Sequence, residues 1–170
     1  MRRCITTLII VGLSIMLGCT NSRPSPITEQ EVNKFIADHD IREVAVEIMG
    51  EIAVVLFNED KFTGYYMLYK DKDGNLQDQI VYGEAGENAP IVVMGSATRF
   101  PFVTVILNDE QILKSASSVA ITFDDQTVVR KELSKNGAII PYGNEVKGNM
   151  FYSNVAIYDA ADNVIYSYPQ

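Results

Sequence analysis

Residues 43–57, EVAVEIMGEIAVVLF, decide the fold that the sequence predicts. Apolar residues stand at every second position of the first half, so Val44, Val46 and Ile48 are expected on one face of a half-exposed strand. A Gly-Glu pair then suits a chain reversal. Residues 52–57 follow as an almost unbroken apolar run, which is typical of a strand in the middle of a sheet. The stretch therefore predicts an antiparallel hairpin whose second strand is central.

A short amphipathic helix is expected directly before this hairpin, over residues 29–39. Thr28 has the side chain of a helix N-cap, and Glu31, three residues later, completes the pattern of a capping box. Ile27 and Val32 occupy the two positions of a hydrophobic staple. The apolar stripe of such a helix has to pack on a neighbour, and the sheet is the available one.

The hairpin is expected to continue into a meander and then into a second, strand-rich half. Residues 63–70 and 76–82 have the composition of strands and are separated by a turn rich in Asp, Gly and Asn. Residues 83–101 hold the most loop-like segments and are the expected boundary between the halves. The short segments of the second half, with polar turns between them, favour a small antiparallel sandwich. Its predicted strands are 102–107, 119–123, 127–133, 138–140, 150–158 and 164–168, with one helical turn at 110–114.

The predicted fold class is mainly β, of the α+β type. We expect the helix and the antiparallel meander in residues 28–95, and a β-sandwich-like domain in residues 96–170. The last hairpin, VAIYD (155–159) followed by NVI (163–165), resembles the final hairpin of immunoglobulin-like and fibronectin type III-like bacterial domains. This resemblance covers about 15 residues and implies a sandwich for the C-terminal half.

The N-terminal residues have the pattern of an export signal. Two arginines precede an apolar run over residues 5–17, and a small residue stands before Cys19. This run of about 13 residues is shorter than the roughly 20 that a transmembrane helix needs. The stretch MLGC (16–19) resembles a bacterial lipobox, with Met16 in place of the Leu that the family prefers.

The resemblance to a lipobox implies a membrane lipoprotein. Residues 1–18 would leave as a signal peptide, Cys19 would carry lipid on its sulfur, and residues 19–27 would form a polar, Pro-containing tether. Several acyl chains anchor a protein stably where a single chain binds only marginally. We therefore expect an extracytoplasmic body, anchored by lipid at the cell membrane or the outer membrane and similar to small bacterial envelope lipoproteins. The alternative is an ordinary secretory signal with a chance Cys near its end.

The composition excludes some classes of partner. The chain has 14 Lys and Arg against 22 Asp and Glu, a net charge of −8, and loss of Arg2 and Arg3 with the signal would bring it to −10. Such a body repels nucleic acid and anionic lipid head groups. Cys4 would leave with the signal and Cys19 would be lipidated, so the mature body would contain no disulfide. Its stability then has to come from a hydrophobic core.

The sequence contains no recognisable catalytic or metal-binding motif. The segment DKDGN (71–75) lacks the Gly and Glu positions of a calcium-binding loop and fits a hairpin turn. His39 is the one histidine, and it is expected near the helix end rather than in a transition-metal site or a catalytic triad. Glu84 and Glu87 are the best candidates for a carboxylate pair, although a solvated loop is the simpler interpretation. We expect no metal, no cofactor and no catalysis.

The residues that are best suited to binding are Arg99, Phe100 and Tyr142. Arginine and aromatic side chains on loops are the types that anchor interfaces. A second interpretation places Phe100 in the core, at the junction between the two halves.

The function expected from these features is a non-catalytic binding module that holds a protein or polymer of the cell envelope near the membrane. A carboxylate-dependent hydrolase of envelope material and an accessory structural subunit of an envelope complex are the alternatives. Two facing carboxylates, one with a raised pKa, would indicate the enzyme. A flat exposed apolar patch would indicate the binding module, and an unpaired edge strand would indicate the subunit.

Overall fold

The computed structural model describes residues 25–59, 62–84 and 89–169. Its elements, in chain order, are α1 (Glu29–Asp38), β1 (Glu43–Met49), β2 (Ile52–Glu59), β3 (Phe62–Lys70), β4 (Leu76–Glu84), β5 (Ile91–Ser96), β6 (Thr98–Arg99), β7 (Phe102–Leu107), α2 (Glu110–Ser115), β8 (Ala116–Phe123), β9 (Val128–Glu132), β10 (Gly137–Pro141), β11 (Val146–Asn149), β12 (Tyr152–Asp159) and β13 (Val164–Tyr168). This order confirms the predicted fold class, which is mainly β with a helix before antiparallel sheets.

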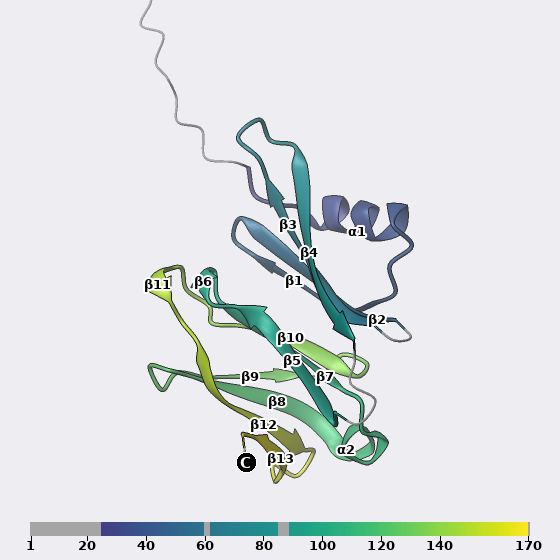
Figure 1. Cartoon of the computed structure of the whole chain (residues 1–170), viewed down its shortest axis with the longest axis vertical. Helices are drawn as coiled ribbons and strands as arrows, with labels where there is room; N and C mark the ends of the chain where they lie inside the picture. The colour runs from purple at the N-terminus through teal and green to yellow at the C-terminus, as the bar shows by residue number, and fades with distance from the viewer. Residues whose placement is uncertain (1–24, 60–61, 85–88, 170) are drawn as a thin grey trace, which may run out of the picture.

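The strands form three main sheets in which every pair is antiparallel. The meander sheet has the order β1-β2-β3-β4, the middle sheet the order β10-β7-β5, and the outer sheet the order β13-β12-β8-β9. The short strands β6 and β11 pair with each other. Figure 1 shows α1 beside one face of the meander sheet and the middle and outer sheets beyond its other face. The molecule therefore consists of four layers: helix, meander sheet, middle sheet and outer sheet.

The predicted capping box at the start of α1 is confirmed. The Thr28 hydroxyl accepts from the Glu31 backbone N–H at 3.3 Å, and the Glu31 carboxylate accepts from the Thr28 N–H at 2.9 Å. Lys70 of β3 also donates to Glu31, and these hydrogen bonds lower the pKa of the Glu31 carboxyl to about 2. Ile27 and Val32, the predicted staple, are both buried against the meander sheet. The helix is thus fixed to the sheet at its N-terminal end.

The prediction that Val44, Val46 and Ile48 share one face of β1 is wrong. The register between β1 and β2 shifts at Val44, so the strand bulges there and the alternation of its faces is interrupted. Ile48 lies on the helix side of the sheet, and Val46 pairs with Val55 on the same side. Val44 is buried on the opposite side, in the core between the meander and middle sheets. A regular alternation in the sequence cannot reveal an extra residue in the ladder.

β2 is central in the meander sheet, as its apolar run predicts, and one of its faces packs on α1. Its other face packs on the middle sheet. That second core contains Val44, Val54, Leu56, Tyr65, Phe102, Ile106 and Ile139. The meander and the strands that follow it are therefore joined by one continuous apolar interface.

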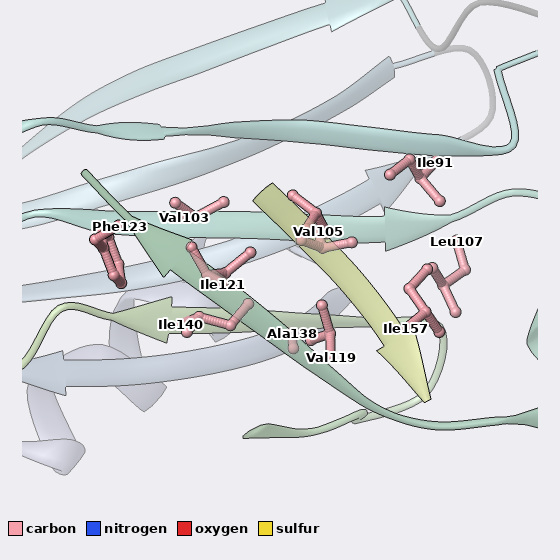
Figure 2. Close-up of a cluster of buried hydrophobic side chains, with 11 residues drawn as sticks. Ile91, Val103, Val105, Leu107, Val119, Ile121, Phe123, Ala138, Ile140 and Ile157 are labelled. Atoms are coloured by element: carbon pink, nitrogen blue, oxygen red, sulfur yellow. The ribbon is translucent and has the colours of Figure 1, made fainter. Parts of the chain in front are cut away.

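β7 is buried along its whole length because it has a sheet on each side. Phe102 and Ile106 point into the core shared with the meander sheet. Val103, Val105 and Leu107 point the other way, into the core shared with the outer sheet, where they meet side chains of β8 and β12 (Figure 2). The middle and outer sheets thus form the predicted small antiparallel sandwich, and the meander sheet adds a further layer.

The expected division of the chain at residues 95 and 96 falls inside β5. This strand pairs with β7 along Ile91 to Ser96, so it belongs to the middle sheet. The meander sheet ends at Glu84, the last residue of β4.

Candidate functional site

Arg99 connects three segments that are far apart in the chain. It lies in β6, in the left-handed backbone region with φ of 51°, which is uncommon for a residue other than glycine. Its guanidinium donates to Glu51 of the β1–β2 turn at 2.6 Å and to Glu145, just before β11, at 3.1 Å. It also lies over the ring of Phe100, 5.1 Å from the centroid. Arg99 therefore holds the β1–β2 turn and the segment before β11 against Phe100.

The electrostatics of Arg99 follow from these two carboxylates. The hydrogen bond with Glu145 and the charge of Glu51 raise the pKa of the Arg99 guanidinium. The Arg99 side chain is 59% exposed, and ion pairs of this exposure contribute little to stability. The two pairs therefore matter for the position of the side chain more than for the free energy of unfolding.

A pocket of about 330 Å³ lies next to Arg99, between the meander sheet and the segment from β5 to β6. Its apolar lining includes Ile52, Met67 and Phe100, and Gln79 of β4 and Thr98 of β6 also line it. We call it the Arg99 pocket. Its volume and mixed lining are those of a small ligand site, or of a recess for one large side chain.

A second hollow of about 310 Å³ lies on the other side of Phe100. Its walls include the β1–β2 turn and the segment from Pro141 to Glu145. Phe100 is half-buried, lines both hollows, and packs its ring against Gly50. The prediction that Phe100 lies at the junction of the halves and the prediction that it lines a surface site are thus compatible. The edge of the ring at Cε1 and Cζ faces Gly50, the Arg99 guanidinium lies over the ring, and the side chain borders both hollows.

Tyr142 does not join this site. Its backbone N–H donates to the Pro101 carbonyl at 2.9 Å, but its side chain points to the β8–β9 turn. There its hydroxyl donates to Asp125 at 2.7 Å, and its ring meets Phe123 edge to face. The hydrogen bond to the Asp125 carboxylate raises the pKa of the Tyr142 phenol. The structure thus brings Arg99 and Phe100 together and places the side chain of Tyr142 elsewhere.

The Asp-rich segments form turns. Asp71 accepts from the backbone N–H groups of Asp73 and Asn75, each at 2.9 Å. Asp159 does the same with Ala161 and Asn163, at 2.9 and 2.8 Å. These are side-chain-to-backbone turns, and their hydrogen bonds lower the pKa of both aspartates. In the described part of the chain, no group of three or more His, Cys, Asp or Glu residues is arranged to hold a metal ion.

Among the residues that the structure describes, the candidate catalytic side chains do not assemble into a site. Glu84 is exposed at the end of β4, and Glu87 lies outside the described residues. His39 caps the C-terminus of α1, with Nδ1 at 2.9 Å from the Phe35 carbonyl and its ring 4.1 Å from the Phe35 ring. Within the described ranges, the carboxylates whose pKa departs clearly from its ordinary value are all lowered, which is the direction expected for ionised structural groups. They are Glu31, Glu43, Asp71, Asp125 and Asp159.

Sequence reasoning missed the residues that complete the Arg99 pocket. Glu51 and Glu145 lie 48 and 46 residues from Arg99 in the chain, and no local pattern marks them as its partners. In the sequence, Met67 and Gln79 have only the pattern of ordinary strand residues, and nothing marks them as part of a pocket. The adjacency of Arg99 and Phe100 was the one available signal, and it identified the centre of the pocket but not its walls.

The proposed lipobox and Cys19 lie outside the described residues. Among the helices of the described part, none is long and apolar enough to cross a membrane. Comparisons of the chain with protein-family models, with curated protein sequences and with solved structures give no match.

Proposed function

We propose that this chain is a bacterial lipoprotein, anchored to a membrane through Cys19, whose β-rich body binds a protein or polymer of the cell envelope without catalysis. Cys19 and the MLGC stretch support the anchor. The observation that carries the binding role is the Arg99 pocket, which combines an apolar floor with a fixed arginine at its rim.

The pocket suits recognition because its parts are held before any partner arrives. Arg99 is oriented by two carboxylates, and the Phe100 ring rests on the β1–β2 turn. Preorganised side chains lose less conformational entropy on binding. An anchored module of this kind acts by raising the local concentration of its partner at the membrane.

Site-specific photo-crosslinking in living cells tests the binding role. A benzophenone amino acid at the exposed Thr98, on the pocket rim, should form adducts with an envelope protein or polymer. The same group at Val128, which is 60% exposed on the distant strand β9, should form few. Adding Phe100→Ala should reduce the adducts at position 98 by about tenfold, since loss of an anchoring aromatic typically costs this much affinity. Equal yields at positions 98 and 128, or yields that Phe100→Ala leaves unchanged, would contradict the proposal.

Intact-mass spectrometry tests the anchor. Wild-type protein from the membrane fraction should carry the additional mass of a diacylglycerol group, and Cys19→Ala should lack it and leave the membrane. An unmodified wild-type chain that fractionates as a soluble protein would refute the lipoprotein assignment.

A further inference from the structure

β4 is the exposed edge of the meander sheet. It is nine residues long and pairs with β3 at every position from Leu76 to Glu84 without a register shift. In the part of the chain that the structure describes, β4 is the last strand of the order β1-β2-β3-β4, and no strand pairs with its other edge. Every second residue of a strand directs its N–H and C=O to the same side, so this edge offers a row of unpaired backbone groups.

β4 lacks most of the features that usually protect an edge strand, and its only charged side chains are the carboxylates of Asp78 and Glu84. Its sequence, LQDQIVYGE, contains no Lys, Arg or Pro, and it has no bulge. The other edges of the three main sheets differ. β1 is bulged and lies beside β10, β9 carries Arg130 and Lys131, and β10 and β13 are only five residues long. β5 is shorter than β4, and the Gly95 carbonyl near its end accepts from the Tyr65 hydroxyl. β4 is therefore the edge most open to another strand.

The two faces of β4 differ in chemistry. On one face Gln79 lines the Arg99 pocket, so a strand added beyond β4 would place a side chain at the mouth of that pocket. On the other face Asp78 and Ile80 are exposed, and Tyr82 is 60% exposed. Strand addition uses backbone hydrogen bonds for affinity and pockets for alternate side chains for specificity, and β4 offers both.

The charges of β4 indicate a basic partner. Among the ion pairs of the described residues, none involves Asp78 or Glu84. A second copy of the chain would bring the same two carboxylates and no cation. A two-fold antiparallel pairing centred on Asp78 or Val81 would even set carboxylate opposite carboxylate, which is destabilising. A Lys or Arg on an incoming strand would be opposite an unpaired negative charge instead.

We propose that β4 takes up an extended segment of a partner protein by strand addition, with Lys or Arg beside Asp78 and a bulky apolar side chain beside Gln79, entering the Arg99 pocket. This inference rests on the proposed function and narrows it, because it selects a protein as the partner and excludes a non-protein envelope polymer. An unpaired edge strand was the feature expected of an accessory subunit, and strand addition at β4 would make the binding module part of such a complex.

The test uses the full chain and a synthetic peptide, acetyl-Lys-Phe-Lys-Val-Lys-Phe-Lys-Val-amide, which alternates basic and apolar residues. Its affinity is measured by fluorescence anisotropy, and its position by amide hydrogen exchange. Bound peptide should slow exchange in residues 76–84. Replacing every Lys of the peptide by Glu should abolish binding. Two further peptides are N-methylated at alternate residues, one at the odd positions and one at the even positions. One of them should bind at least about tenfold more weakly than the unmethylated peptide, because its methyl groups replace the N–H groups that pair with the edge of β4.

Matched variants locate the charge contact. Asp78→Lys should weaken peptide binding by about tenfold or more, as expected when a close charge pair becomes repulsive. Asp124→Lys makes the same charge change on the exposed β8–β9 turn and should leave the affinity within about threefold, because a distant exposed charge is screened. Equal weakening by both variants, full binding of both N-methylated peptides, or bound peptide that leaves exchange in residues 76–84 unchanged would overturn the inference.

Light scattering tests whether a second copy of the chain, and not a partner protein, occupies the edge of β4. Dimerisation that rises with concentration, together with slower exchange in residues 76–84, would assign the edge to a second copy and overturn the partner strand. These experiments are independent of the crosslinks at position 98. Failure of the peptide alone therefore removes strand addition, whereas failure of both experiments removes the binding role of the pocket.

Discussion

Thr104 is a polar residue in the middle of an apolar strand. It lies in β7 with 1% of its surface exposed, and its hydroxyl has no hydrogen-bond partner among the described residues. Thr63 is equally buried, but its hydroxyl donates to Asn58 at 2.7 Å. The two threonines differ in whether the desolvation of the hydroxyl is offset by a hydrogen bond, which decides the sign of its contribution to stability.

We therefore expect opposite effects from the same substitution at these two positions. Thr104→Val keeps the shape and removes the unpaired hydroxyl, and should raise the free energy of unfolding by about 1 kcal/mol. Thr63→Val leaves Asn58 without its donor and should lower it by about 1 kcal/mol. Urea unfolding followed by circular dichroism measures both. A loss of stability in Thr104→Val as large as that in Thr63→Val would show that the hydroxyl of Thr104 is satisfied.

The strands and the hairpins between consecutive strands were predictable from the sequence, whereas the pairing and packing of strands farther apart in the chain were not. Alternation and apolar runs located β2, β3 and β7, and the Asp-Gly-Asn turn located the β3–β4 hairpin. Local patterns report only the neighbours of a residue in the chain. They therefore could not reveal the bulge at Val44. They also could not reveal that β5 pairs with β7, in the middle sheet, and not with the meander strands that precede it. They also could not show that the meander sheet covers the middle sheet.

Two glycines in the β3–β4 hairpin differ in the space around their Cα atoms: Gly64 is closely packed, and Gly83 faces open space. A Cβ on Gly64 would lie 2.4 Å from the Val81 carbonyl oxygen and 2.7 Å from the Phe57 ring, whereas a Cβ on Gly83 would meet nothing within 4 Å. Gly64→Ala should therefore lower the free energy of unfolding by about 3 kcal/mol through overpacking. Gly83→Ala should change it by less than about 0.5 kcal/mol, as most surface substitutions do. Thermal melts of the two variants compare them directly, and equal melting temperatures would mean that β4 moves to accommodate the methyl group.

The whole molecule depends on β7, whose two faces belong to two different cores. Arg99 and Phe100 could be grouped from the sequence because they are neighbours in the chain. Glu51 and Met67 became part of their pocket because the meander sheet packs on the middle sheet. Tyr142 follows directly after β10, and its side chain lies on the side of the middle sheet that faces the outer sheet, where its ring packs on Phe123. It therefore does not join Arg99 and Phe100.

A strand shared by two cores should make the molecule unfold as one unit. Val105→Ala truncates a side chain of the outer-sheet core, and Ile106→Ala truncates its neighbour in the meander core. Each should lower the free energy of unfolding by about 2 to 4 kcal/mol. Both should shift one common transition, with equal calorimetric and van't Hoff enthalpies. Two separate transitions in either variant would mean that the meander and the sandwich unfold independently.

The burial of β7 also has a consequence for the chain before it folds. Its sequence, FVTVIL, has no charge, no Pro and no Gly, which is the composition of segments that aggregate when exposed. Its partner β10 starts at Gly137, thirty residues after Leu107, so a ribosome has to synthesise most of the chain before β7 can be covered on both edges. Export in an unfolded state, which the proposed lipoprotein anchor implies, would prolong this exposure further. A cell that makes this protein therefore has to keep β7 away from other copies during synthesis, and a chaperone that binds unfolded chains is one means of doing so.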